Sequence, residues 1–176
     1  MKERALFLDR DGVINVDHGY VYQIEEFQFT EGIFELLHLF LSKGYKLFIV
    51  TNQSGIGRGY YSQKQFLELT RFLLDRLLEE GITIEEVEYC PHAPEEQCYC
   101  RKPAVGMVDR ICSHYQIDLK NSWLIGDKQS DIDLAYNAHI GQSIAIGERM
   151  ITGATLSFKT ILNCKSYLEE NQGKIT

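Results

Sequence analysis

The amino-acid sequence predicts an α/β fold with a doubly wound, mostly parallel β-sheet. Short apolar runs alternate along the chain with longer segments of helical periodicity. Apolar runs without polar alternation are typical of strands that helices cover on both faces. Three of these runs lead into a polar residue: Asp9, Thr51 and Asp127. Because the carboxyl ends of parallel strands meet at one edge of a sheet, we expect these three side chains to lie close together.

The first half of the chain is expected to supply three strands and two long helices. In chain order, these elements are predicted at residues 5–8, 31–43, 45–50, 63–80 and 84–89. Apolar residues at helical spacing indicate the helices over 31–43 and 63–80. Gly44 and Gly81 follow them, and glycine commonly ends a helix. Residues 13–30 lie between the first strand and the first helix, so we expect them to form a small flap.

The second half of the chain is expected to continue the same alternation. The elements predicted there are a helix at 105–115, a strand at 123–125, a helix at 130–138, a strand at 143–146 and a weaker helix at 164–171. Neither an internal repeat nor a low-complexity linker interrupts this pattern. We therefore expect a single domain over residues 1–176.

Composition and charge narrow the classes of function. The 176 residues are 44% hydrophobic and 24% charged, a balance that allows a globular core without disulfides. The net charge of −7 argues against a general binder of nucleic acid or of an anionic membrane, which needs a basic face. No apolar run approaches the roughly 18 residues of a membrane span, and the N-terminus does not resemble a secretory signal. We expect a cytoplasmic monomer with mostly reduced cysteines.

The segment Phe-Leu-Asp-Arg-Asp-Gly at residues 7–12 places two carboxylates at a strand end. Asp9 and Asp11 are separated by one residue, so a loop that leaves the strand could direct both toward one pocket. One carboxylate could attack phosphorus while the other handles the proton of the leaving group. Asp127 could add a third carboxylate for Mg²⁺, which prefers oxygen ligands. The alternative is a polar turn, because Asp and Gly are common in turns.

Four motifs together resemble the haloacid dehalogenase (HAD) superfamily of phosphohydrolases. In the superfamily's order they are Asp9-x-Asp11-Gly12, Thr51-Asn52, Lys102 and Gly126-Asp127-x-x-x-Asp131. The resemblance covers nearly the whole chain and implies a HAD-like, Rossmann-like sheet. The sequence has no room for a large cap domain, so we expect a capless and open site. The resemblance also implies that Asp131 supports the residues of the site without binding the phosphate or the metal itself.

The same resemblance implies a role for each of the other motif residues. It implies that Asp9 is the nucleophile that forms an aspartyl-phosphate and that Asp11 is the general acid and base. It implies that Thr51 binds the transferring phosphoryl group and that Lys102 neutralises its charge. It also implies that Asp9, Asp127 and the backbone carbonyl of Asp11 hold a catalytic Mg²⁺ ion.

Three cysteines and a histidine gather within residues 90–100. They are Cys90, His92, Cys98 and Cys100. Three thiolates and one imidazole suit tetrahedral Zn²⁺, and four protein ligands leave no open position for catalysis. We therefore expect a structural zinc ion that stiffens the loop before Arg101 and Lys102. The alternative is a chance cluster of buried cysteines.

Within the HAD superfamily, the chain resembles a branch that contains two kinds of phosphatase. Residues 90–103 fit the histidinol-phosphate phosphatases at least as well as the heptose 1,7-bisphosphate 7-phosphatases, which often carry a longer loop here. Residues 9–15, 17–21 and 51–59 resemble the heptose enzymes. The resemblance implies hydrolysis of the C7 phosphate of D-glycero-D-manno-heptose 1,7-bisphosphate, in the biosynthesis of ADP- or GDP-heptose precursors of lipopolysaccharide. Histidinol phosphate or another small phosphomonoester is the alternative.

Polar side chains are expected to bind the sugar and its second phosphate. The predicted substrate-binding residues are Asp17, His18, Gly19, Tyr20, Asn52, Gln53, Ser54, Arg101 and Lys128. For the segment from Asp17 to Tyr20 the alternative is a solvated loop with an aromatic anchor. A hypothesis of another class is a zinc-stabilised binding protein whose catalytic site is unused. The intact set of motif residues argues against it.

Overall fold

A six-stranded parallel sheet forms the centre of the computed structural model, which describes residues 1–175. Its strands are β1 Ala5–Leu8, β2 Lys46–Asn52, β3 Glu86–Cys90, β4 Trp123–Gly126, β5 Gln142–Ile146 and β6 Leu156–Phe158. Their order in the sheet is β3-β2-β1-β4-β5-β6. The chain first builds outward from β1 to β3 and then crosses over to build outward from β4 to β6. The direction of winding therefore changes between β1 and β4, where sheets of this kind bind their ligands.

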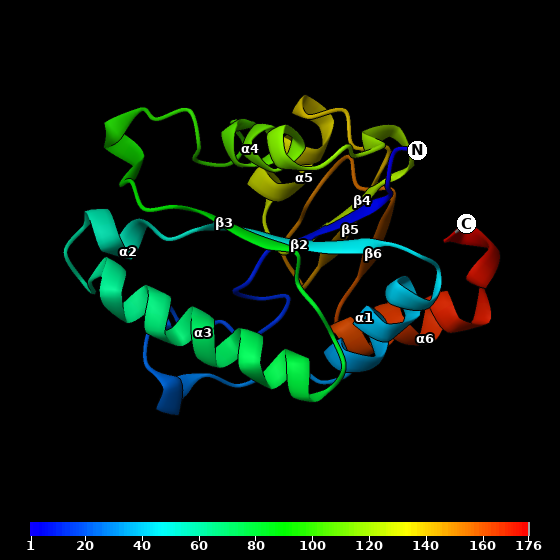
Figure 1. Cartoon of the computed structure of the whole chain (residues 1–176), viewed down its shortest axis with the longest axis horizontal. Coiled ribbons are helices and arrows are strands. Elements are labelled where there is room, and N and C mark those ends of the chain that lie inside the picture. The colour runs from blue at the N-terminus through cyan, green and yellow to red at the C-terminus, as the bar shows by residue number, and fades with distance from the viewer. Residues whose placement is uncertain (176) are drawn as a thin grey trace.

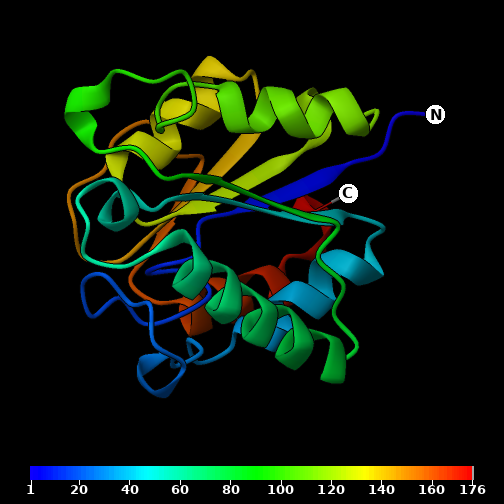
Figure 2. The same ribbon diagram turned by 60° about the vertical axis from the view of Figure 1, so that its left-hand side comes forward.

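Helices cover both faces of the sheet (Figure 1). The α-helices are α1 Ile33–Ser42, α2 Ser54–Gly57, α3 Gln63–Glu79, α4 Gly106–His114, α5 Gln129–Asn137 and α6 Ile161–Glu170. Short 3-10 turns occur at Ile24–Glu26, Pro94–Glu96, Leu119–Asn121 and Gln172–Lys174. Helices α4 and α5 lie on one face, and α1, α3 and α6 lie on the other, as the rotated view also shows (Figure 2).

Alternate residues of each strand contribute to two separate cores. In β1, Leu6 and Leu8 belong to the core under α1, α3 and α6, whereas Ala5 and Phe7 belong to the core under α4 and α5. All four side chains are fully buried. Burial of both faces explains why the strands lack polar alternation. It also fixes Asp9, the residue after β1, at the carboxyl edge of the sheet.

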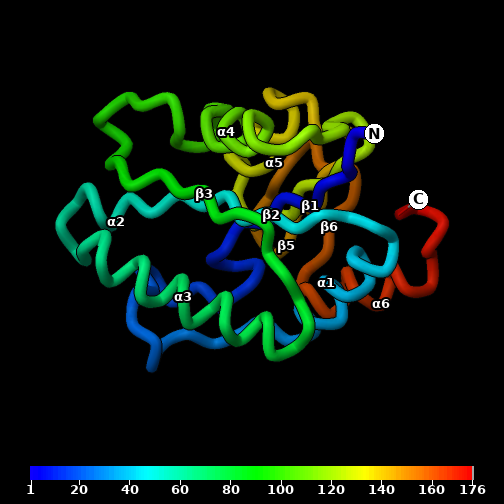
Figure 3. Tube along the Cα trace, in the orientation of Figure 1, coloured from blue at the N-terminus to red at the C-terminus, as the bar shows by residue number. Residues whose placement is uncertain are grey.

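Residues 13–30 form the expected flap between β1 and α1. Val16 N donates to Gln28 O at 2.9 Å and Thr30 N donates to Ile14 O at 2.9 Å, so the two ends of the flap are joined. The blue trace of the flap runs beside α3 in the tube view (Figure 3). The flap therefore forms one wall at the carboxyl edge of the sheet.

The predicted α/β class with a parallel sheet is confirmed, and single elements differ. Strand β3 lies at Glu86–Cys90 instead of 84–89, and α6 begins at Ile161 instead of residue 164. The sequence patterns missed β6 because this edge strand has three residues and an exposed serine at its centre. They missed α2 because it is a single short turn with two glycines. That the chain is one domain stays a prediction. Within residues 1–175, no helix is both long and apolar enough to cross a membrane.

Candidate active site

The carboxyl edge of the sheet brings together the acidic residues that follow β1 and β4. Carboxylate oxygens of Asp9, Asp127 and Asp131 lie within 4.8 Å of one another. All three residues are buried, and so is Thr51, which lies near the end of the neighbouring strand β2. The structure therefore places the three predicted strand-end residues on one edge.

The ammonium group of Lys102 lies buried between two of these carboxylates. Its Nζ is 2.9 Å from Asp9 Oδ1 and 2.6 Å from Asp131 Oδ1, and it donates to Val50 O at 2.9 Å. Burial opposes the charge of the amine, but the carboxylates of Asp131 and Asp9 outweigh burial and raise the pKa of Lys102. The backbone N–H of Lys102 donates to Asn52 Oδ1 at 3.0 Å. Lys102 is therefore a fixed cation beside the oxygen of Asp9.

The surroundings of Asp9 and Asp127 disfavour two negative charges. Burial raises the pKa of Asp9, although the neighbouring Lys102 acts in the opposite direction. Burial and the Asp9 carboxylate raise the pKa of Asp127 to about 7. A cation bound between the two carboxylates stabilises their ionised forms, so this pair is suited to hold one.

The carboxylate of Asp127 is oriented so that one oxygen stays available. Arg149 Nη1 donates to Asp127 Oδ2 at 2.8 Å and to Asp127 O at 3.1 Å. Gly12 leaves room for this carboxylate, because a Cβ at Gly12 would collide with it. Asp131 Oδ2 accepts the backbone N–H groups of Asp127 and Lys128, each at 3.1 Å. Asp127 Oδ1 is buried without a hydrogen-bond partner in residues 1–175, so it is free to bind a hard divalent cation.

Both oxygens of Asp11 accept hydrogen bonds. Oδ1 accepts from Arg10 Nη2 at 2.8 Å and from Asn15 Nδ2 at 3.0 Å. Oδ2 accepts from Gln53 Nε2 at 3.0 Å. Gln53 is 2% exposed, so its side-chain amide is buried. These hydrogen bonds fix the Asp11 carboxylate, while Asp11 stays partly exposed.

A cavity of about 230 Å³ opens beside Asp11. Its walls are Asp11, Asp17, Gly19, Tyr20, Asn52, Gln53, Ser54, Tyr61 and Lys128. The structure therefore gathers all of the predicted substrate-binding residues except His18 and Arg101. His18 is exposed on the flap, and Arg101 is half-buried in the loop before Lys102.

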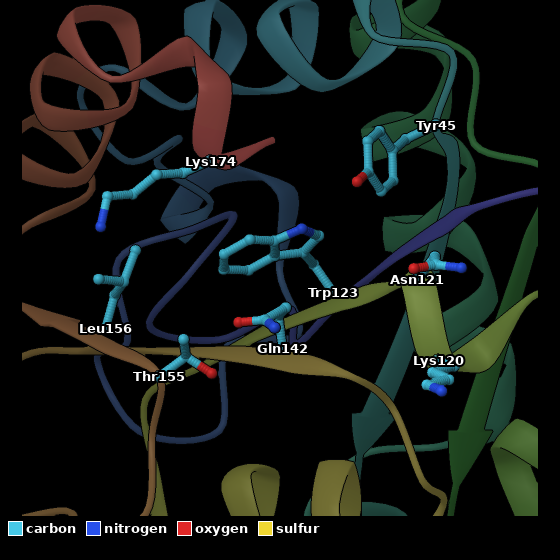
Figure 4. A pocket seen from close by; sticks show the side chains of 8 residues that line it. All are labelled: Tyr45, Lys120, Asn121, Trp123, Gln142, Thr155, Leu156 and Lys174. Atoms are coloured by element: carbon cyan, nitrogen blue, oxygen red, sulfur yellow. The ribbon is translucent and has the colours of Figure 1, made fainter. Parts of the chain in front are cut away.

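Two further hollows lie at opposite ends of the sheet, and only the first of them adjoins the site. One, of about 560 Å³, has walls that include Gly12, Asp17, Asp127 and Arg149, and it shares Asp17 with the smaller cavity. The other, of about 400 Å³, lies at the opposite end of the sheet and is lined by Trp123, the first residue of β4 (Figure 4). The length of the strands separates this last hollow from Asp9 and Asp127, so it is not part of the site.

Four residues of the network around the acidic groups were not anticipated from the sequence: Arg10, Asn15 and Arg149 contact carboxylates, and Tyr61 contacts Gln53. The position of Arg10 between two functional aspartates was a signal that could have found it. Tyr61 and Arg149 had no such signal, because each reaches the site from an irregular segment that follows another element.

The ligand atoms of the cysteine-histidine loop lie within 4.8 Å of one another. Cys90 Sγ is 3.4 Å from Cys98 Sγ, and His92 Nδ1 is 3.2 Å from Cys100 Sγ. This compact set of three sulfurs and one nitrogen fits tetrahedral Zn²⁺. Gln53 N donates to Cys90 O at 2.8 Å, so the loop is joined to the end of β2 beside the site.

A known family and several curated relatives match most of the chain. The family described as polynucleotide kinase 3 phosphatase matches residues 8–144. A D-glycero-alpha-D-manno-heptose-1,7-bisphosphate 7-phosphatase from Campylobacter jejuni is 45% identical over 171 residues, covering 97% of this chain and 98% of the relative. A D-glycero-beta-D-manno-heptose-1,7-bisphosphate 7-phosphatase from Helicobacter pylori strain J99 is 49% identical over 144 residues, covering 81% of this chain and 83% of the relative.

Solved structures share the fold. A HAD-like phosphatase from Mesorhizobium loti superposes with a TM-score of 0.82 at 28% identity, covering 96% of this chain and 87% of the other. A D,D-heptose 1,7-bisphosphate phosphatase from B. bronchiseptica, complexed with magnesium and phosphate, also has a TM-score of 0.82, at 23% identity, with coverage of 96% and 99%. The expectation of a HAD-like fold is thereby confirmed.

Proposed function

Because the chain belongs to the family of D-glycero-D-manno-heptose-1,7-bisphosphate 7-phosphatases, we propose that it hydrolyses the C7 phosphate of such a heptose bisphosphate. It is a HAD-type phosphatase. The observation that most strongly supports the substrate is the 45% identity to the Campylobacter jejuni enzyme over almost the full length of both chains. The described relatives include enzymes named for the alpha and for the beta anomer.

The proposed reaction has two steps at the same phosphorus. Asp9 attacks the phosphorus of the C7 phosphate, and the C7 oxygen leaves with a proton from Asp11, which yields an aspartyl-phosphate and the sugar alcohol. Asp11 then accepts a proton from the water that attacks this phosphorus, which releases inorganic phosphate and restores Asp9. Lys102 Nζ, 2.9 Å from Asp9 Oδ1, offsets the charge of the phosphoryl oxygens, and Thr51 donates its hydroxyl to them.

Asp9, Asp127 and the carbonyl of Asp11 are proposed to hold Mg²⁺. The two carboxylates lie in one buried cluster, and Asp127 Oδ1 lacks a hydrogen-bond partner among the described residues. When bound, the ion supplies positive charge that lets an anionic nucleophile approach an anionic phosphate. Arg149 and Asp131 keep the cluster in place through the contacts described above.

We propose that the cavity beside Asp11 takes the sugar and that Lys128 and Arg101 take its second phosphate. Lys128 lines the cavity, and Arg101 Nη1 is buried without a hydrogen-bond partner within residues 1–175, so both offer donors to an anion. Asp17 and Tyr20 from the flap face the sugar hydroxyls. A role for His18 stays a prediction.

Phosphate release with Mg²⁺ from a substrate panel tests the proposed function. The panel contains both anomers of heptose 1,7-bisphosphate, histidinol phosphate and small generic monoesters. We expect kcat/KM for a heptose bisphosphate to exceed that for histidinol phosphate by about 100-fold or more. Preference for histidinol phosphate would overturn the proposed substrate, and no turnover of any ester by the zinc-loaded protein would favour a binding protein.

We further propose that the product supplies heptose precursors of lipopolysaccharide in the cytoplasm. The names of the relatives support a sugar phosphate as the small-molecule partner. A monomeric state and the absence of nucleic-acid and membrane partners stay predictions. Size-exclusion chromatography with light scattering tests the first of these.

Mg²⁺ is expected to stabilise the protein more at about pH 8 than at about pH 5. Burial raises the pKa of Asp127 to about 7, so the folded state holds this proton more tightly than the unfolded state does. That contribution to stability is present below the unfolded pKa and is lost as pH rises through about 7. Mg²⁺ binds the ionised carboxylate and offsets the loss, so the rise in Tm on adding MgCl₂ should grow with pH. Asp127→Asn should remove this growth, and a pH-independent rise in wild-type Tm would contradict the assignment.

Zinc in the cysteine-histidine loop is proposed to be structural. We expect about one zinc per chain by elemental analysis, and Cys98→Ser should lose it. Loss of a ligand should lower Tm by about 5 °C or more and kcat/KM by about 10-fold, because the loop precedes Lys102. Cys112→Ser is the matched control, since Cys112 lies outside the cluster and should keep its zinc. A fully active, equally stable Cys98→Ser protein without zinc would refute the structural role.

A further inference from the structure

The two oxygens of the Asp11 carboxylate have different surroundings. Oδ1 accepts three N–H groups, from Arg10 Nε at 3.3 Å, Arg10 Nη2 at 2.8 Å and Asn15 Nδ2 at 3.0 Å. These donors occupy its lone pairs, so Oδ1 has no room for a proton. Among residues 1–175, the only hydrogen-bond donor to Oδ2 is Gln53 Nε2, at 3.0 Å. Oδ2 is therefore the oxygen that can carry a proton to a leaving group.

The side-chain amide of Gln53 connects three functional groups. Its Nε2 donates to Asp11 Oδ2 at 3.0 Å and to Thr51 Oγ1 at 2.9 Å. Its Oε1 accepts the hydroxyl of Tyr61 at 2.5 Å. The reverse orientation of the amide would place Oε1 against the Asp11 carboxylate, and acceptor would face acceptor. The sequence indicated Gln53 as a substrate ligand, but these three contacts use its polar atoms inside the protein.

Tyr61 fixes the orientation of the Gln53 amide. Burial raises the pKa of Tyr61 to about 12, so its hydroxyl stays protonated and donates. The Tyr61 ring stacks on Tyr22 of the flap, with centroids 5.1 Å apart and planes 9° from parallel. Gly55 permits this position, because a Cβ there would collide with the Tyr61 ring. The Tyr61 side chain therefore has little freedom.

We propose that Gln53 and Tyr61 are positioning residues for Asp11: Tyr61 orients the Gln53 amide, and the amide holds Asp11 Oδ2 toward the leaving group. The inference deepens the proposed phosphatase function and rests on it. It requires no contact between either residue and the sugar. In the first step the proton moves from Asp11 Oδ2 to the departing oxygen as the phosphorus–oxygen bond breaks.

A positioning role differs from substrate binding in its dependence on the leaving group. A phenoxide leaving group needs the proton from Asp11, whereas p-nitrophenoxide departs without it, and the two esters differ little in size. The kcat/KM value reports only the steps through phosphoryl transfer to Asp9, so the later use of Asp11 as a base does not enter it.

The experiment measures kcat/KM for phenyl, 4-chlorophenyl and p-nitrophenyl phosphate with wild type, Tyr61→Phe and Gln53→Leu. Tyr60→Phe is the matched control, because Tyr60 is 54% exposed and the structure shows no hydrogen bond of its hydroxyl to a side chain within residues 1–175. We expect phenyl phosphate hydrolysis to fall about 10-fold in Tyr61→Phe and about 30-fold in Gln53→Leu, with p-nitrophenyl phosphate within about 3-fold of wild type. Equal losses across the three esters, or none, would overturn the proposal.

A double-mutant cycle of Gln53 and Asp11, with heptose bisphosphate as the substrate, tests the same proposal. In an Asp11→Asn background, Gln53→Leu should cause no further loss in kcat/KM, because the group that it positions is gone. A further loss as large as in the wild-type background would show that Gln53 acts through the substrate or through Thr51 instead of through Asp11. If the aryl esters are hydrolysed but heptose bisphosphate is not, the proposed substrate fails while the ester series still decides the role of Gln53.

Discussion

Asp9→Asn is expected to lower kcat by at least about four orders of magnitude and to leave the fold intact. A carboxamide is a far weaker nucleophile than a carboxylate, so the aspartyl-phosphate cannot form. The fold should persist because burial already raises the pKa of Asp9, which means that the folded protein tolerates a neutral side chain at this position. The side-chain oxygen of asparagine can still accept from Lys102, which contacts Asp9 Oδ1 at 2.9 Å.

Phosphate release and thermal unfolding of the same preparation check this expectation. Asp75→Asn is a matched control, because Asp75 is exposed on α3 and the same chemical change there should alter neither measurement. A variant at position 9 that keeps more than about a hundredth of the wild-type kcat would exclude covalent catalysis by this residue. A variant that lacks activity and has also lost its unfolding transition would instead show that Asp9 is needed for folding.

The meeting of Asp9 and Asp127 could be predicted because it follows from strand polarity alone. Parallel strands deliver whatever follows them to one edge of the sheet. Leu8 and Ile125 are partners in adjacent strands, so Asp9 and the residues after Ile125 must reach the edge together. The apolar runs that end on polar residues are therefore enough to predict that Asp9 and Asp127 meet.

The contacts around those residues could not be predicted in the same way. The position of Arg10 between two aspartates marks it as a residue near the site, but it does not reveal that Arg10 is 1% exposed, because Asp11 and the carbonyl of Val21 accept its N–H groups. Arg149 reaches Asp127 from the segment after β5, and no periodicity marks such a segment. The partners of Arg10 and Arg149 depend on how the loops run in the folded chain, and only the tertiary fold determines this.

Lys102→Met is expected to destabilise the protein by about 3–5 kcal/mol near neutral pH and to lower kcat at least about 1,000-fold. The change keeps an unbranched side chain that is only one heavy atom shorter, but it removes a charge that lies 2.9 Å from Asp9 Oδ1 and 2.6 Å from Asp131 Oδ1. Two carboxylates then remain buried without a cation, which is the costly way to break a buried ion pair. The rate falls because the ammonium group of Lys102 no longer offsets its share of the repulsion between Asp9 and the phosphate.

The loss of stability in Lys102→Met should depend on pH in a definite direction. Burial already raises the pKa of Asp9, and removal of Lys102 takes away the main influence that lowers it. Carboxyl groups with raised folded pKa values stabilise the folded state below their unfolded pKa, and this contribution is lost as pH rises through the folded pKa. In wild type the pKa of Lys102 is raised, so its charge and its contribution persist throughout the neutral range. The stability gap between wild type and variant should therefore widen from about pH 5 to about pH 8.

Urea unfolding at both pH values without added Mg²⁺ measures this gap. Lys64→Met on the exposed surface of α3 is the control for loss of a lysine charge, and its effect should stay within about 0.5 kcal/mol at either pH. A gap that is constant with pH would mean that Lys102 acts through packing of its chain and not through its charge. The assignment of Lys102 to phosphoryl transfer rests on its positive charge beside the oxygen of Asp9. An effect that comes only from packing would therefore remove the reason for that assignment.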